Sequence, residues 1–261
     1  MSETMANLSL CAPLSDERLK CATSIYNNLP EVSTQPAIDE KYLDFFDNLL
    51  CRHRLQGVIG LHLAHSHHPI PDNTILLGTS INVSGGTNVE KSIRRWAKPT
   101  LVKDVRGKQI HGHVYVVKPD GSLHPYEFQH GHSPVPSELD LGPFLREFAK
   151  AVMEKELQDL IALEILHPED TDRELALEFI VDEVHHILVD ESVAGGWKQT
   201  RTTGWAHRVE GNGGARVLKG NVAYAPPPKN PTAHQTYTDG KPDAKPSTVS
   251  DVASALAALW E

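Results

Sequence analysis

The 261-residue chain has few cysteines, no excess of positive charge and no long hydrophobic run. Its three cysteines, Cys11, Cys21 and Cys51, form no C-x-x-C pair, which argues against a disulfide framework and a thiolate zinc cluster. The net charge is −9, whereas nucleic-acid-binding proteins normally carry a basic stripe, so we expect no nucleic acid partner. No apolar run approaches the roughly 20 residues that cross a bilayer, and the N-terminus has no signal-peptide pattern. We therefore expect a cytoplasmic protein that does not bind membranes.

Helical periodicity marks four segments of the chain. Residues 14–29 and 35–55 carry apolar side chains at helical spacing, and Ser15 is a suitable N-cap for the first of them. Two longer apolar faces run through residues 144–166 and 174–189. We expect these two long helices to cover one side of a sheet.

Between these helices, β-branched and apolar runs predict about five mostly antiparallel strands. They are residues 57–70, 73–83, 100–105, 109–117 and 122–129. Asp120 and Gly121 stand between the last two runs and indicate a tight hairpin. A two-residue loop there places His111 opposite His130 on the neighbouring strand. The same register sets His113 opposite Phe128, on the same side of the sheet.

These elements predict an α+β fold rather than a doubly wound one, because helices and strands are segregated along the chain. We expect a single domain over residues 1–195 and an irregular arm with a proline-rich linker over 196–247. A short amphipathic helix is expected over residues 248–261. The linker is long enough for this helix to pack on its own subunit or on a neighbour, and we expect a homodimer.

Histidine is unusually frequent: the chain has 15, and nine of them lie from His62 to His132. This stretch holds three H-x-H pairs, His65/His67, His111/His113 and His130/His132. Because alternate residues of a strand share a face, His65 and His67 should point the same way where an apolar strand ends. A partly dry position of this kind suits metal ligands.

The imidazoles predict a divalent metal site on the sheet, with iron, zinc or copper as the ion. The expected ligands are His65, His67, His111, His130 and Asp72. His113, Tyr115 and Tyr126 are the candidate acid–base or substrate-contacting groups. Three imidazoles are typical of catalytic zinc, and two with a carboxylate are typical of non-haem iron. The predicted function is a small-molecule enzyme: an oxygenase with iron or copper, a hydrolase or hydratase/lyase with zinc.

Within residues 60–78, a glycine, the pair His65/His67, Asp72 and a second glycine follow in this order. The order resembles the first metal-binding motif of the cupins, and the resemblance implies His65, His67 and Asp72 as ligands. The acid is Asp rather than Glu, and two spacers are one residue short. The chain has no good counterpart of the second cupin motif, and two long helices are not a cupin feature.

Other arrangements of the same residue types compete with this site. Glu164/His167 and Glu183/His186 have the E-x-x-H spacing of four-helix di-iron proteins, although solvated helix faces explain that spacing as well. The sheet histidines can also line a metal-free pocket or serve only the fold.

A cationic patch at Arg94, Arg95 and Arg106 predicts recognition of an anionic small-molecule substrate through its carboxylate or phosphate. Docking of the patch against the acidic helices is the alternative. The competing function for the whole chain is a non-catalytic small-molecule-binding or assembly protein that uses the acidic helices and the C-terminal arm.

Overall fold

The computed structural model describes residue 10 and residues 14–82, 85–167, 176–181, 185–190, 201–209, 215–224 and 248–260. The strands within these residues are β1 (Ile59–Leu63), β2 (Thr74–Ser80), β3 (Ile93–Leu101), β4 (Ile110–Val117), β5 (Leu123–His130), β6 (Ile161–Ile165), β7 (Ala176–Val181), β8 (His185–Asp190), β9 (Arg201–Val209) and β10 (Ala215–Tyr224). The helices are α1 (Asp16–Asn28), α2 (Glu40–His53), α3 (Asn88–Ser92), α4 (Val102–Val105), α5 (Gly142–Glu154) and α7 (Val249–Trp260).

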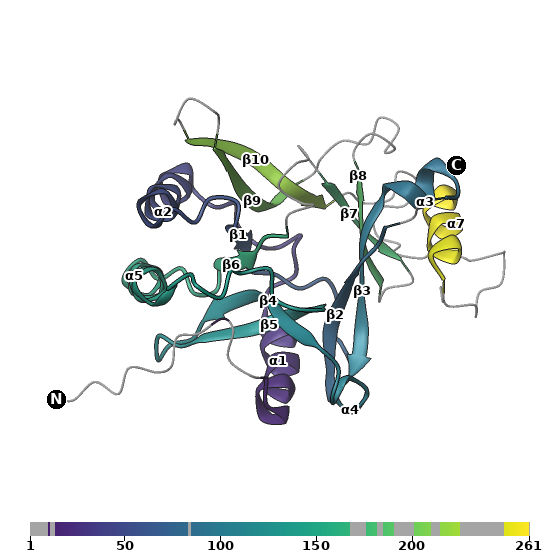
Figure 1. Cartoon of the computed structure of the whole chain (residues 1–261), viewed down its shortest axis with the longest axis horizontal. Helices are drawn as coiled ribbons and strands as arrows, with labels where there is room; N and C mark the ends of the chain where they lie inside the picture. The colour runs from purple at the N-terminus through teal and green to yellow at the C-terminus, as the bar shows by residue number, and fades with distance from the viewer. Residues whose placement is uncertain are drawn as a thin grey trace.

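The strands form one strongly curled mixed sheet that closes into a barrel in the order β1-β6-β4-β5-β2-β3-β8-β7-β10-β9. Strand β9 pairs with β1 and completes the ring. The pairs β2/β5 and β7/β10 are parallel, and the other neighbours are antiparallel. In Figure 1 the helices lie outside the ring of strands. The helices that the structure describes are all too short or too polar to cross a lipid bilayer.

Apolar side chains on the outer face of the barrel pack against these helices. On β6, Leu163 belongs to the same apolar cluster as Phe148 of α5. The next residue back, Ala162, instead joins an inner cluster with Tyr126 of β5. Since side chains alternate across a strand, Glu164 shares the inner face with Ala162. The barrel therefore buries ionisable side chains within the ring, and its outer face supplies most of the apolar packing.

The expectation of about five strands packed by two N-terminal and two long C-terminal helices is wrong. The first long helix stops at Glu154, and residues 161–165 form β6. Glu156 has a left-handed backbone, with φ of 56°. The N–H of Leu157 donates to the carbonyl of Val152 at 2.9 Å, which closes a Schellman motif. The left-handed residue of such a motif is usually glycine. Because glutamate takes that position here, the sequence carries no sign that the helix ends.

Where the second long helix was expected, over residues 174–189, the described residues form the paired strands β7 and β8. Leu177, Phe179 and Val181 alternate along β7 and lie in one apolar cluster with α7. The apolar residues of this segment thus follow the two-residue period of a strand, although their spacing also fits a helix.

The expected strand over residues 100–105 is also shifted along the chain. Strand β3 covers Ile93–Leu101, and the following turn is helix α4.

The expected irregular arm contributes two strands to the barrel, β9 and β10. The proline-rich linker, residues 226–246, lies outside the described residues. The C-terminal amphipathic helix is confirmed as α7, whose Val252 and Leu256 are fully buried against β7 and β8. The N-cap of α1 is confirmed as well, because the Ser15 side chain accepts the N–H of Arg18 at 3.2 Å.

The expected register of the β4–β5 hairpin is wrong by one residue. Lys118 donates its N–H to the carbonyl of Ser122 at 2.8 Å, and Gly121 between them has φ of 80°. The loop is therefore a three-residue turn with a left-handed glycine rather than a two-residue turn. His111 consequently lies opposite Gln129 and not opposite His130. A slip of one residue moves every side chain to the other face of its strand.

Candidate metal centre

The segment that follows β1 brings two histidines to the same point. Strand β1 ends at Leu63, so His65 and His67 lie beyond it in an irregular segment. Ser66 between them is held on the opposite side, where it forms an isolated bridge with Glu31 and its hydroxyl donates to the carbonyl of Leu29 at 2.9 Å. This extended stretch directs the side chains of His65 and His67 to the same side of the chain, with their ring planes at 89° to each other.

A glutamate from β7 completes the group. The Nε2 atoms of His65 and His67 are 3.2 Å apart, and Glu178 Oε2 lies 3.2 Å from His67 Nε2 and 4.0 Å from His65 Nε2. The three side chains are 2%, 4% and 12% exposed. Two imidazoles thus meet, at one buried point, a carboxylate that lies more than 100 positions further along the chain.

The hydrogen bonding of His65 leaves a lone pair directed at this point. Its Nδ1 lies 2.6 Å from the carbonyl of Leu63, which can only accept, so Nδ1 carries the proton. Burial first, and then the neighbouring rings of His67 and His62, lower the pKa of His65 well below its usual range. The neutral ring therefore presents an unprotonated Nε2. Metal-binding histidines show the same pattern, with one nitrogen on a carbonyl and the other on the ion.

The carboxylate of Glu178 is held from its other side. Its Oε1 lies 3.5 Å from Nδ1 of His186 on β8, and Nε2 of that ring lies 3.5 Å from the Tyr26 hydroxyl. Burial raises the pKa of Glu178, but the contacts with His67 and His186 lower it further, and the net pKa is well below normal. The group therefore supplies a negative charge along with its imidazole nitrogens.

The spacing of these three atoms suits a shared cation. Ligand atoms about 2.1 Å from one ion are about 3.0 Å apart at a right angle and about 3.4 Å apart at a tetrahedral angle. Two of the three separations, both 3.2 Å, lie in this range, and the third needs a small side-chain movement. His65, His67 and Glu178 form a group that could hold a metal ion.

A second set of ionisable side chains lies beside this group on the inner face. The Glu164 carboxylate of β6 faces His62 Nδ1 at 3.5 Å and His113 Nε2 at 3.2 Å. Burial raises the pKa of Glu164, but His113 and His62 lower it more, so it stays ionised. The ring of His62 stacks on that of His65, with centroids 5.2 Å apart and planes at 12°. The two sets are thus in direct contact.

Three of the expected ligands lie away from the group. His111 is buried, with Nδ1 3.0 Å from the carbonyl of Gly131, and its ring lies beside His167. His130 and Asp72 are exposed to solvent. The carboxylate beside His65 and His67 therefore comes from β7, although the cupin-like motif implied Asp72.

The expected acid–base residues occupy different faces. His113 belongs to the Glu164 set on the inner face. Tyr126 is fully buried within the ring. Tyr115 lies in the outer apolar cluster, where its hydroxyl donates to the carbonyl of Leu10 at 2.8 Å.

The three arginines of the expected anion patch each pair with a different acid. Arg94 pairs with Asp190, Arg95 with Glu127 at 2.8 Å, and Arg106 with Asp16. The ion pair of Arg95 is the most deeply buried of the three. The side chains of Arg95 and Glu127 are 13% and 11% exposed. Arg106 lies on the surface.

Sequence reasoning missed Glu178 altogether, and it considered Glu164 and His186 only as members of E-x-x-H pairs. Both glutamates stand inside apolar strands, in "IALEI" of β6 and "ALEFIV" of β7. A single acid in a short, otherwise apolar run is the signal that could have found them, because burying it without a partner is costly.

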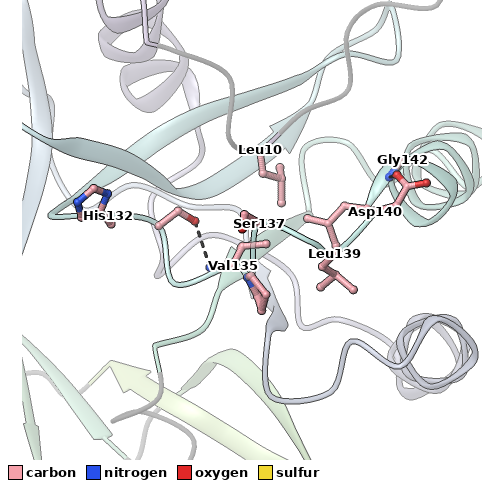
Figure 2. A pocket seen from close by; sticks show the side chains of 10 residues that line it. Leu10, His132, Val135, Ser137, Leu139, Asp140 and Gly142 are labelled. Carbon is pink, nitrogen blue, oxygen red and sulfur yellow. Dashed lines mark hydrogen bonds between the residues drawn. The ribbon is translucent and has the colours of Figure 1, made fainter.

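The pocket drawn in Figure 2 is separate from the metal group. It has a volume of about 520 Å³ and is lined mainly by the segment between β5 and α5, from His132 to Gly142, together with Leu10. None of the residues in the two ionisable sets lines it.

No protein-family model matches the chain, and no match was found among curated proteins or solved structures. The function of the chain therefore rests on the chemistry of the site.

Proposed function

We propose that this protein is a metal-dependent small-molecule enzyme whose metal is bound by His65, His67 and Glu178. The observation that carries the proposal is the convergence of two Nε2 atoms and one carboxylate oxygen on one buried point, two of the three separations being 3.2 Å. The tautomer of His65 supports it, since the proton is on Nδ1 and the lone pair is on the nitrogen facing the group.

Three protein ligands leave coordination positions open for water or substrate, as in catalytic rather than structural sites. Zinc in such a site supplies an activated water at neutral pH, and ferrous iron with the same donors supplies oxygen chemistry. The inner face beside the group carries Glu164, His62 and His113 alongside the apolar side chains of the inner cluster. This lining suits a polar substrate and reactions that move protons, so we favour zinc-dependent hydrolysis or hydration.

The test is metal binding by protein that carries no histidine tag. The metal content of the protein as purified identifies the ion, because affinity alone favours zinc over iron at most sites. EDTA-treated protein is then titrated with zinc while its melting temperature is followed. Zinc at 100 times its Kd stabilises the folded chain by about 2.7 kcal/mol. For a chain of this size that raises the melting temperature by about 5–10 °C.

Glu178→Gln keeps the size of the side chain, and His67→Ala removes one ligand; both should abolish the zinc-induced shift. His132→Ala is the matched control, because that imidazole is exposed and lies outside the group. Unchanged zinc stabilisation in both ligand variants would contradict the proposal. Iron in the purified protein would redirect it to oxygenation at the same ligands.

A further inference from the structure

We infer that Tyr26 and His186 are positioning residues of the metal centre, and that together they fix the place and orientation of two of its three ligands. This inference rests on the proposed function and deepens it, because it names the residues outside the ligand group that set its affinity for metal. Both act through the ligands and lie outside the group itself.

His186 holds the carboxylate ligand from its far side. It lies on β8 opposite Ile180 of the neighbouring strand β7, and its side chain is 4% exposed. Glu178 directs Oε2 at the two histidine ligands and Oε1 at Nδ1 of His186, which is 3.5 Å away. The two carboxylate oxygens therefore have separate roles: one faces the position of the ion, and the other is held by the adjacent strand.

The proton of His186 lies on the nitrogen that faces this carboxylate. Glu178 stays ionised and its oxygens can only accept, so Nδ1 of His186 carries the hydrogen. Burial, the largest influence, lowers the pKa of His186, so the ring holds one proton and Nε2 keeps a lone pair. This lone pair lies 3.5 Å from the Tyr26 hydroxyl, which is therefore the donor. The hydrogen bonds run in one direction, from Tyr26 through His186 to Glu178.

Tyr26 also holds the backbone of a histidine ligand. It lies in the last turn of α1 and is fully buried. Its oxygen accepts the N–H of His67 at 3.3 Å. Burial first, and then the charge of Glu127, raise the pKa of Tyr26 well above its ordinary value, so the hydroxyl keeps the hydrogen that it donates to His186. One hydroxyl group thus connects to two ligands, directly to His67 and through His186 to Glu178.

These contacts have the form of the outer hydrogen bonds of metal centres. Such a bond fixes the orientation and the charge of a ligand before the ion binds, and its removal typically lowers metal affinity by about 10–100-fold. The need for support is clear at His67, which lies beyond the end of β1 in an irregular segment. Its contact with Tyr26 therefore helps to determine where its ring lies.

The test measures the zinc affinity of EDTA-treated, tag-free, full-length protein by competition with a chromophoric chelator. Tyr26→Phe removes one oxygen atom and should raise the Kd for zinc by about 10–100-fold. Tyr115→Phe is the matched control, because it removes the hydroxyl of another buried tyrosine, one that donates to the carbonyl of Leu10 outside the group. Its Kd should equal that of the wild type.

A pair of substitutions tests His186. His186→Leu keeps a side chain of similar size without a donor and should weaken zinc binding by a similar factor. His186→Asn places an N–H group near the position of Nδ1 and should restore most of the affinity. Cobalt(II) bound to His186→Asn should show the visible absorption bands of the wild type, because the three ligands are unchanged. Shifted bands would make His186 a ligand and overturn its positioning role.

A wild-type Kd in both Tyr26→Phe and His186→Leu would overturn the inference and leave the proposed function intact. Equal weakening in Tyr26→Phe and Tyr115→Phe would overturn it too, because a general loss of stability would then explain both. A wild-type protein that binds no zinc would overturn the proposed function as well. Should His186→Leu fail to fold, as judged by circular dichroism in EDTA, Tyr26→Phe and its control decide the question alone.

Discussion

The stability of the metal-free protein should fall steeply between neutral pH and pH 5, and His167 should account for a measurable part of the loss. The ring of His167 lies beside those of His113 and His111, at centroid distances of 5.7 and 5.4 Å. Burial first, then these two rings and Arg95, lower the pKa of His167 to about 3 from the ordinary 6.5. Above pH 6.5 the ring is neutral in both states, so it has no effect on stability there.

Between pH 6.5 and 3 only the unfolded chain binds this proton, so the free energy of unfolding decreases as the pH falls. At pH 5 the full effect is about 1.5 pH units at 1.36 kcal/mol each, or about 2 kcal/mol. Because the ring is only partly buried, solvent screening reduces this to about 1 kcal/mol. His65, His111, His113 and His186 shift in the same direction and add to the slope.

The assay compares urea unfolding of wild type and His167→Gln at pH 8 and pH 5, with EDTA present throughout. The variant should lose about 1 kcal/mol less than the wild type between the two pH values, a difference of about 2–4 °C in melting temperature. His132→Gln, which removes an exposed imidazole, serves as the control and should follow the wild type. Equal losses in wild type and His167→Gln would refute this account of the buried ring.

Three further variants test the packing around the site. Gly112→Ala should lower the free energy of unfolding by about 1–3 kcal/mol, because the added Cβ would overlap the Tyr115 hydroxyl and lie 2.7 Å from Pro125 Cβ. Gly85→Ala has nothing within 4 Å and should be neutral; equal effects in chemical denaturation would contradict the steric reasoning. Leu256→Ala should cost about 2–5 kcal/mol if α7 is part of the core, and an unchanged melting temperature would show that it is not. Arg95→Met should cost about 3–5 kcal/mol by leaving Glu127 buried without its partner, and adding Glu127→Gln should recover most of that loss. No recovery in the double variant would mean that the pair itself does not carry the cost.

Local patterns located several elements of this chain correctly. Helix α1, with its Ser15 cap, and helix α7 follow from amphipathic spacing and capping chemistry, which act over a few neighbouring residues. Strands β2, β4 and β5 follow from apolar, β-branched runs bounded by turn residues. The histidine-rich stretch was likewise located by its composition, and the pair His65/His67 lies in the candidate metal centre.

The same local patterns could not separate the strands β6 to β8 from helices. Short apolar runs fit both the helical period and the two-residue period of a strand. The end of α5 depends on the left-handed backbone of Glu156, at a position where glycine is usual. The hairpin register depended on whether the turn held two residues or three, which Asp120-Gly121 alone does not decide. Because the turn holds one residue more than expected, His111 pairs with Gln129 and not with His130.

The sequence by itself determined the chemical character of the site, an excess of imidazoles with acids available as partners. Only the tertiary structure decided which acid meets which imidazole. Glu178 lies 111 positions from His67 and reaches it because β7 belongs to the same closed ring as β1, separated from it by β10 and β9. Glu164 meets His62 and His113 because β6 inserts between β1 and β4. Strand order in a sheet is set by long-range packing of the apolar outer face, and no local pattern in the chain encodes it.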